Sequence, residues 1–331
     1  MKTRPPAVAG SFYPADPFTL GQQIDDFLAV DGGDKTAAAV APKVLLCPHA
    51  GIIYSGKTAG IGYAQLLAHR ARIRRVVLLG PTHRVGIRGL AVPSVDAFAT
   101  PLGEIPIDRA GRAAALRLPQ VAMSDAPHLA EHSLEVQLPF LQRALDRFSV
   151  LPLAVGEASA AEVAEVIDAV WGGAETLIVI SSDLSHFHAY DEAQVIDRDS
   201  IDTVLALAGP LDHEQACGAT PLNGLLRVAQ RRGLKPLLLD LRNSGDTAGD
   251  RRRVVGYAAL RFDEAPTAAP RPDEIAALAA SPALGVALLG IARQAIQARL
   301  SGVAPEILQE PGLTMLDQPA ATFVTLTKNG E

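Results

Sequence analysis

The sequence has few cysteines, few aromatic residues and no long apolar run. Its 331 residues include only Cys47 and Cys217, so a framework of several disulfides is excluded. No apolar stretch approaches the ~20 residues that a membrane-spanning helix needs. The first ten residues, MKTRPPAVAG, lack the apolar core of a signal peptide. We therefore expect a cytoplasmic protein that makes no contact with membranes.

Clustered positive charge is also missing. The net charge is −6, and the longest basic run, Arg251–Arg253, has three residues. A nucleic-acid surface needs grouped Lys and Arg, so we do not expect nucleic acid as a partner. Aromatic residues make up 5% of the chain and hydrophobic residues 48%. The composition predicts a large core of Ala, Val, Leu and Ile, as in α/β enzymes.

Apolar runs typical of buried strands alternate with segments of helical periodicity. This alternation predicts a three-layer α/β/α fold with a central mixed, largely parallel sheet. The predicted strands are Lys43–Cys47, Arg74–Leu79, Leu90–Val92, Ile105–Ile107, Val150–Ala154, Leu177–Ile180, Leu237–Leu241 and Val254–Phe262. The predicted helices are Phe18–Leu28, Lys57–Ala68, 109–116 with Asp108 as N-cap, Asp125–Leu145, Ala160–Trp171, Glu192–Leu207 and Pro221–Arg231.

Three of the predicted strands end in polar residues that can bind metals or transfer protons. His49 follows the first strand and His83 follows the second. The strand Leu177–Ile180 runs into a polar cluster that contains Asp183, His186 and His188. In open α/β sheets, ligands bind outside the carboxyl ends of the strands. The sequence therefore predicts that these side chains gather at one edge of the sheet.

Cys217 stands at the start of a predicted helix, where the positive end of the helix favours the thiolate. Imidazole combined with thiolate or carboxylate is a ligand set for Fe, Zn or Cu. Two other hypotheses stay open. His128, Glu131 and His132 fit H-x-x-E-H, the inverted zinc-peptidase pattern, which a short chance match also produces. Because Asp125 and Pro127 indicate a helix start, we expect His128 near the surface, and we expect neither His128 nor Glu131 to be a zinc ligand. Cys217 could also act as a nucleophile if a histidine activates it.

Seven stretches in order along residues 3–262 resemble the Memo family, the B component of the AmmeMemoRadiSam system. They are RPPAVAGSFYPADP, CPHAGIIYSGKTAG, LLGPTHRVGIRGLAVP, EHSLEVQLPFLQ, VISSDLSHFHAYDEA, CGATPLNGLL and VVGYAAL. The resemblance implies a fold like that of the class III extradiol dioxygenases, which use non-haem iron held by two His and one Glu.

Mapped by motif, His49 and His83 match the two histidine ligands, and Cys217 falls where the dioxygenases carry the Glu. His186 matches the acid/base histidine, with Asp183 beside it. A thiolate in place of a carboxylate is a softer ligand, so the resemblance implies a divalent metal, Fe(II) first and Cu or Zn as alternatives.

The resemblance also assigns a supporting set of residues that line the pocket or hold the ligands: His132, Glu135, His188 and Tyr54. Two functions remain open. One is a metal-dependent redox enzyme, related to the dioxygenases, that acts on an unknown small molecule. The other is a non-catalytic interaction protein that binds a metal or a phosphopeptide in the same cleft. Radical SAM and AMMECR-type proteins of the same system are expected as partners.

The tail differs from the rest of the chain. Residues 263–272 begin a Pro-rich stretch, DEAPTAAPRPD, that predicts a linker between a domain at 1–262 and a segment at 273–331. That segment, with ALGVALLGIARQAIQARLSG and AATFVTLTKNGE, resembles the beginning of an AMMECR-type domain. We expect it to be a small, incomplete α+β fragment, because the strands that pair with 322–327 in that family lie beyond KNGE.

This division predicts the outcome of limited proteolysis. Exposed linkers are preferred sites of nicking, so a protease should cut within Asp263–Asp273 and leave a stable fragment of about residues 1–262. Mass spectrometry of the digest measures the fragment. Resistance of the linker, together with unfolding of the whole chain in one cooperative transition, would show that the tail is an integral part of the fold.

Overall fold

The computed structural model describes residues 2–29 and 40–264, together with Gly290, Arg293 and Ser301. The chain divides into two units, Met1–Ala265 and Pro266–Glu331, and nearly all described residues belong to the first. Apart from the three single residues just given, the expected fragment at 273–331 and the linker beyond Glu264 lie outside the described residues. The domain division therefore stays a prediction.

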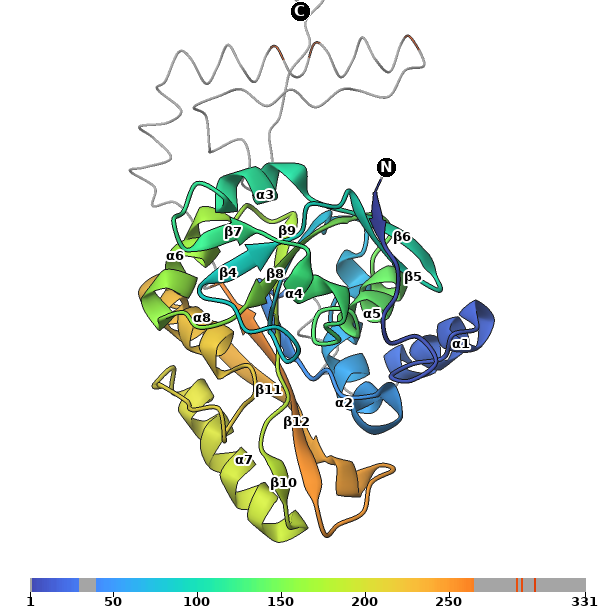
Figure 1. Cartoon of the computed structure of the whole chain (residues 1–331), viewed down its shortest axis with the longest axis vertical. Coiled ribbons are helices and arrows are strands. Elements are labelled where there is room, and N and C mark those ends of the chain that lie inside the picture. Colours follow the sequence, from blue (N-terminus) through green and yellow to red (C-terminus); the bar gives the residue numbers. More distant parts are fainter. Residues whose placement is uncertain (1, 30–39, 265–289, 291–292, 294–300, 302–331) are drawn as a thin grey trace, which may run out of the picture. The chain divides into compact units, whose positions relative to one another are not determined.

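A large mixed sheet forms the centre of the first unit (Figure 1). Its strands are β2 (Val44–Cys47), β3 (Arg75–Pro81), β4 (Leu90–Val92), β7 (Val121–Met123), β8 (Ser149–Val155), β9 (Thr176–Ser181), β10 (His186–His188), β11 (Lys235–Asn243) and β12 (Val254–Asp263). They lie in the order β10-β12-β2-β9-β3-β8-β4-β7, and β11 also pairs with β12. The four central strands β2, β9, β3 and β8 are parallel, so their carboxyl ends share one edge.

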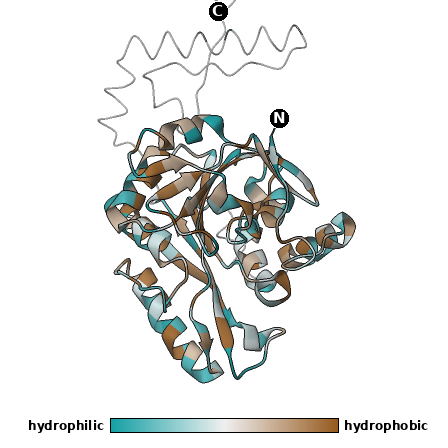
Figure 2. Cartoon of the chain, viewed as in Figure 1, coloured by the Kyte–Doolittle hydropathy of each residue, from teal (hydrophilic) through white to brown (hydrophobic). Residues whose placement is uncertain are grey.

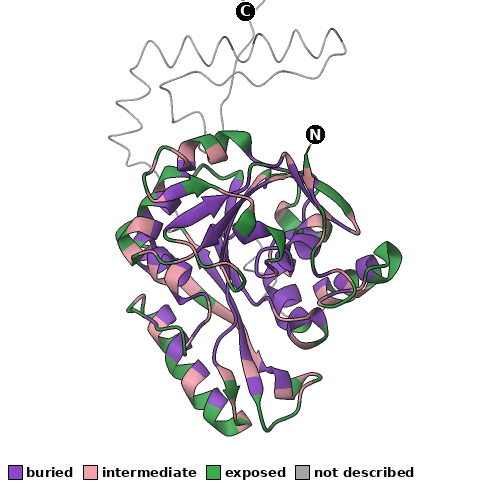
Figure 3. Cartoon of the chain, viewed as in Figure 1, coloured by how far each residue is buried: buried purple, intermediate pink, exposed green. Residues whose placement is uncertain are grey.

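Helices cover both faces of the sheet. Residues of α1 (Pro17–Leu28), α2 (Ile52–Ala64) and α5 (Gln137–Ala144) belong to the core on one face. Residues of α6 (Ala160–Ala169), α7 (Tyr190–Leu205) and α8 (Ala219–Arg232) belong to the core on the other. The predicted three-layer α/β/α architecture is therefore confirmed. The hydropathy and burial of the chain follow the same layers, with apolar, buried residues along the central strands (Figures 2 and 3).

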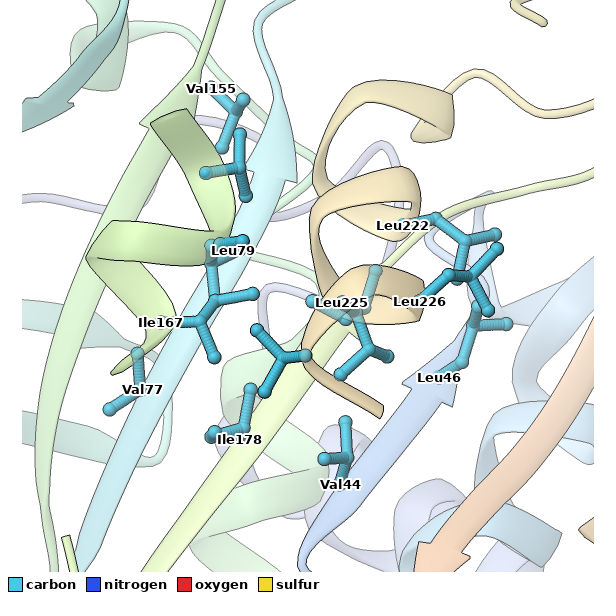
Figure 4. Close-up of a cluster of buried hydrophobic side chains, with 14 of the residues drawn as sticks. Val44, Leu46, Val77, Leu79, Val155, Ile167, Ile178, Leu222, Leu225 and Leu226 are labelled. Atoms are coloured by element: carbon cyan, nitrogen blue, oxygen red, sulfur yellow. The ribbon is translucent and has the colours of Figure 1, made fainter. Parts of the chain in front are cut away.

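Alternating side chains along each strand supply the two cores. In β3, Val77 and Leu79 point to the face covered by α6 and α8, whereas Val76 and Leu78 point to the opposite face. Figure 4 shows the first of these cores, where Leu225 of α8 lies over the strands. Because both faces are buried, the interior of each central strand is apolar, which is why these strands were predictable from the sequence.

Smaller elements complete the unit. A second sheet contains β1 (Thr3–Arg4), β5 (Ala97–Thr100) and β6 (Gly103–Pro106), with β1 parallel to β5. Two short helices, α3 (Arg109–Ala115) and α4 (Ala126–Leu129), and 3-10 turns at Leu67–His69 and Ser244–Asp246 join the strands. Asp108 caps α3 as predicted, because its carboxylate accepts the backbone N–H of Gly111 at 2.9 Å.

The predicted helix Asp125–Leu145 is wrong. The chain forms α4, leaves helical geometry, and begins α5 only at Gln137. Pro139 explains the late start, since proline is tolerated in the first turn of a helix but not in its interior. In the intervening residues, the side chain of Glu131 accepts the backbone N–H groups of His132 and Ser133, which competes with helical hydrogen bonds. This irregular segment, 130–136, brings several polar side chains towards the carboxyl ends of the central strands.

Candidate metal centre at the strand ends

Three histidines meet beyond the carboxyl ends of the central strands. His49 follows β2 by two residues, His83 follows β3 by two residues, and His132 comes from segment 130–136. One ring nitrogen of each lies within 4.8 Å of the others. The ring centroids are 5.3 Å apart for His49 and His83 and 4.7 Å apart for His83 and His132. The structure thus contains a triad of imidazoles, His49/His83/His132, that could hold a metal ion.

His49 is held through both its ring and its backbone. Its Nδ1 lies 2.9 Å from the Ser181 hydroxyl, which also accepts from Gln137 and donates to the carbonyl of Ser133. Its backbone N–H donates to Oδ1 of Asp183 at 2.7 Å. Burial lowers the pKa of His49 to about 4, although the charge of Asp183 opposes the shift. The ring is therefore neutral at pH 7, with Nε2 left as a lone-pair donor toward the triad.

Glu131 connects the other two histidines. Its carboxylate accepts from His83 twice, from Nδ1 at 2.9 Å and from the backbone N–H at 2.5 Å. Its Oε1 also lies 3.2 Å from Nδ1 of His132, a buried nitrogen that makes no hydrogen bond to any residue the structure describes. Burial would raise the pKa of Glu131, but the contacts with the two rings and with backbone N–H groups lower it well below the usual range. Glu131 is therefore a carboxylate at pH 7.

Cys217 lies beside the triad, with Sγ 3.3 Å from Nε2 of His49. It precedes Gly218, the N-cap of α8. The expected thiolate is not what the surroundings favour, because burial and then the charge of Asp183 raise the pKa of Cys217 to about 12. The helix end does not offset these two effects. The Cys–His contact that a cysteine nucleophile needs is present, but the pKa shifts of both partners oppose a thiolate–imidazolium pair.

The structure places the other predicted residues around or away from this centre. Asp183 holds the backbone of His49, and its Oδ2 lies 3.9 Å from Nε2 of the same residue. His186 directs Nδ1 at the carbonyl of Leu184, 2.8 Å away. The remaining supporting residues lie elsewhere: His188 beside Glu192, Tyr54 half-buried in α2, and Glu135 in a buried ion pair with Arg4.

The residues of the H-x-x-E-H pattern face different surroundings. Glu131 and His132 belong to the centre, whereas His128 packs edge-on against Phe98 and lies 3.1 Å from the carbonyl of Ala91 through Nε2. Our expectation that His128 is near the surface is wrong, because these contacts leave the residue only 2% exposed. His128 is outside the imidazole triad.

A pocket of about 1010 Å³ opens beside the centre. His83 and Cys217 form part of its wall, so both face a space that a small molecule can enter. The rest of the lining comes from the end of β3 and the loop after it, from the end of β8 through the first turn of α6, and from the residues just before and at the start of α8. These residues are Pro81, Thr82, Gly86, Ile87, Arg88, Val155, Gly156, Glu157, Ala158, Ser159, Glu162, His213 and Thr220.

Three imidazoles, a thiol and a carboxyl group lie together at the strand ends of an α/β/α sheet. The protein is therefore of the α/β class and has a candidate metal centre. The chain belongs to the Memo-like protein family, whose model matches residues 4–261. It is 38% identical to a MEMO1 family protein of Aquifex aeolicus over 274 residues, which cover 79% of this chain and all of the relative. MEMO1 family proteins of Sulfolobus acidocaldarius and Methanosarcina barkeri are 32% and 34% identical, covering 79% and 78% of this chain and 99% and 98% of the relatives.

These comparisons confirm the family predicted from the motifs. The likeness of the fold to class III dioxygenases and the AMMECR-type origin of the tail stay predictions. Among residues 2–29 and 40–264, no helix is long and apolar enough to cross a membrane. The motifs predicted only a supporting role for His132, whereas the structure puts its ring beside His49 and His83. Pro139 was the available signal in the sequence, since a proline fits the first turn of a helix but not the interior of a continuous helix through His132.

The buried histidines predict how stability depends on pH. The pKa is about 4 for both His49 and His128, against 6.5 for an unperturbed histidine. Between these values the unfolded chain binds more protons than the folded one, so the unfolding free energy of the metal-free protein should fall as the pH decreases from 6.5 towards 4. Urea unfolding at several pH values measures the slope, and His128→Gln should reduce the proton uptake by about one.

The exposed His213 offers a matched control. His213→Gln removes an exposed ring on the wall of the open pocket, so a change of slope in His128→Gln alone reports the burial of His128 and not the loss of a histidine as such. Equal slopes for wild type and His128→Gln would contradict the prediction.

Proposed function

We propose that this chain binds one divalent metal ion at the imidazole triad and acts as a metal-dependent redox enzyme on a small molecule. Fe(II) is the first candidate, and Cu and Zn are the alternatives. The geometry of the triad and the family resemblance both support His49 and His83 as ligands. His132 is the third imidazole. Cys217, whose Sγ lies 3.3 Å from Nε2 of His49, is the candidate for a further ligand as a thiolate.

The observation that carries the proposal is the charge around the triad. Glu131 and Asp183 are only 1% and 4% exposed, and in the described part of the chain neither side chain has a Lys or Arg partner. Buried charges in proteins are paired or coordinate metals. Two buried acidic groups beside the imidazole triad leave a position where a divalent cation restores the balance. The donor set of imidazole and thiol suits Fe, Cu or Zn.

The residues around the triad have distinct roles under this proposal. Ser181 and Glu131 hold the Nδ1 atoms of His49 and His83, which fixes the ring orientation and leaves Nε2 of each for the ion. A bound Fe or Cu would supply redox chemistry. The adjoining pocket would bind the substrate against His83 and Cys217. Asp183 or His186 would move protons, as the resemblance implies, and Oδ2 of Asp183 lies 3.9 Å from Nε2 of His49.

Metal binding should release a proton if Cys217 is a ligand. The pKa of the thiol is about 12 in the metal-free protein, and a ligating thiol must lose its proton. Calorimetric titration of the metal-free protein with Zn²⁺, in two buffers of different ionisation enthalpy, measures the protons released at pH 7. Cys217→Ser should release about one proton fewer than wild type, and its affinity should depend less on pH.

Equal proton release by the two proteins would show that Cys217 is not a ligand. His132→Ala tests the third imidazole independently. Loss of Zn²⁺ binding in this variant supports the triad, and full retention would contradict it. Failure of the wild-type chain to bind Zn²⁺, Fe²⁺ or Cu²⁺ would overturn the proposal as a whole.

Catalysis is tested separately from metal binding. Dioxygen uptake by the Fe(II)-loaded protein with catechols as probe substrates should exceed that of a His49→Ala variant, which lacks a ligand. His186→Ala should lower turnover by about 10²–10⁴-fold if this residue is the acid/base, while metal content stays unchanged. A metal-loaded protein without turnover, and with tight binding of a phosphotyrosine peptide, would favour the non-catalytic interaction protein instead.

A further inference from the structure

Segment 130–136 delivers His132 and Glu131 to the centre without being helical itself. Its position is set by the N-terminal arm, residues 4–13, which precedes α1. Arg4 is the principal contact. Its Nε donates to the carbonyl of His128 at 2.6 Å and its Nη2 to the carbonyl of Glu131 at 2.9 Å. The second of these bonds lies on the peptide group that joins Glu131 to His132.

Glu135, near the other end of segment 130–136, also binds the N-terminal arm. Its Oε2 lies 2.5 Å from Nη1 of Arg4 and also accepts from the backbone N–H of Ala7. Its Oε1 accepts from the backbone N–H of Val8 and from the Tyr13 hydroxyl. A single carboxylate thus binds several separate positions of the arm.

The arm also reaches the loop that carries His49. The carbonyl of Phe12 accepts from the backbone N–H of Ile52, the first residue of α2, at 2.8 Å. The Phe12 ring packs against the ring of His132, with centroids 4.6 Å apart. The arm therefore connects the loop of His49 with the segment that carries His132.

We propose that Arg4 is a positioning residue for the metal centre: through its bonds to segment 130–136 it holds Glu131 and His132 at the distance from His83 that metal binding needs. The proposal rests on the proposed function. Arginine suits the position because its planar fork reaches several acceptors in fixed directions, whereas the ammonium of lysine acts as a point charge. Outer contacts of this kind typically change metal affinity by about 10–100-fold.

The variant Arg4→Lys tests the inference. It keeps a positive charge for the buried Glu135 but cannot reproduce the bonds to both carbonyls. We expect Zn²⁺ affinity at least about tenfold weaker than wild type. We also expect a smaller rise of Tm on addition of Zn²⁺, because ligand-induced stabilisation follows affinity. Glu135→Gln, a second variant that keeps the shape of the side chain, should weaken binding in the same direction.

Arg261→Lys is the matched control. Arg261 is 2% exposed and Arg4 is 4% exposed, and both bind a carboxylate and a backbone carbonyl. Arg261 lies on β12 opposite Leu45, at the amino end of β2, away from the triad. Its replacement should lower the Tm of the metal-free protein but leave the affinity and the Zn²⁺-induced rise of Tm at their wild-type values.

The outcomes separate this inference from the proposed function. Wild-type affinity in a folded Arg4→Lys protein overturns the positioning role and leaves the metal centre in place. An equal loss of affinity in Arg261→Lys also overturns it, because the effect would then be one of general stability. Absence of Zn²⁺ binding by the wild-type chain overturns both. Weaker binding in Arg4→Lys alone, with control and wild type alike, supports the inference.

Discussion

The Glu131 carboxylate joins two loops that the sheet alone would not bring together. It binds the ring and backbone of His83, which the sheet places, and the backbone of His132 and Ser133, which the sheet does not place. A buried carboxylate loses the hydration of its charge and must recover it through hydrogen bonds. The carboxylate of Glu131 has hydrogen-bond donors in place of water only when both loops are in position. Its burial and the assembly of the triad therefore depend on each other.

Parallel strands provide the other half of the centre. Cys47 and Ser181 pair across β2 and β9, and the two following loops carry His49 and Asp183. Their proximity follows from the register of the sheet, which in turn follows from the apolar packing on both of its faces. The hydrogen bonds from the backbone of His49 and Ala50 to Asp183 then fix the loops relative to each other. The packed sheet thus sets the positions of His49 and His83. The contacts of the Glu131 carboxylate then set the position of His132.

This difference explains how much of the site could be predicted from the sequence. Strands such as β3 and β9 are continuous apolar runs, so their presence and the sites at their ends were predictable. The role of His132 was not, because it depends on contacts from residues that are distant in the sequence, such as Arg4. Periodicity suggested a helix through this region, and the tertiary contacts of Glu131 and Glu135 overrode it. The pKa of Cys217 was also beyond the sequence, because burial decided it rather than the helix end.

The candidate centre combines neutral donors with fixed negative groups. His49 is neutral because it is buried, and Cys217 keeps its proton for the same reason. A cation that binds both groups would remove the proton of Cys217 but leave His49 neutral, because imidazole binds a metal in its neutral form whereas a thiol must ionise. Binding through the three imidazoles alone would leave the thiol protonated and free to face the pocket. Under the proposed metal binding, loss of the Cys217 proton would place the sulfur among the ligands, and retention of the proton would leave it facing the pocket. The two cases would differ in how soft the ligand set is, and therefore in which metal it favours.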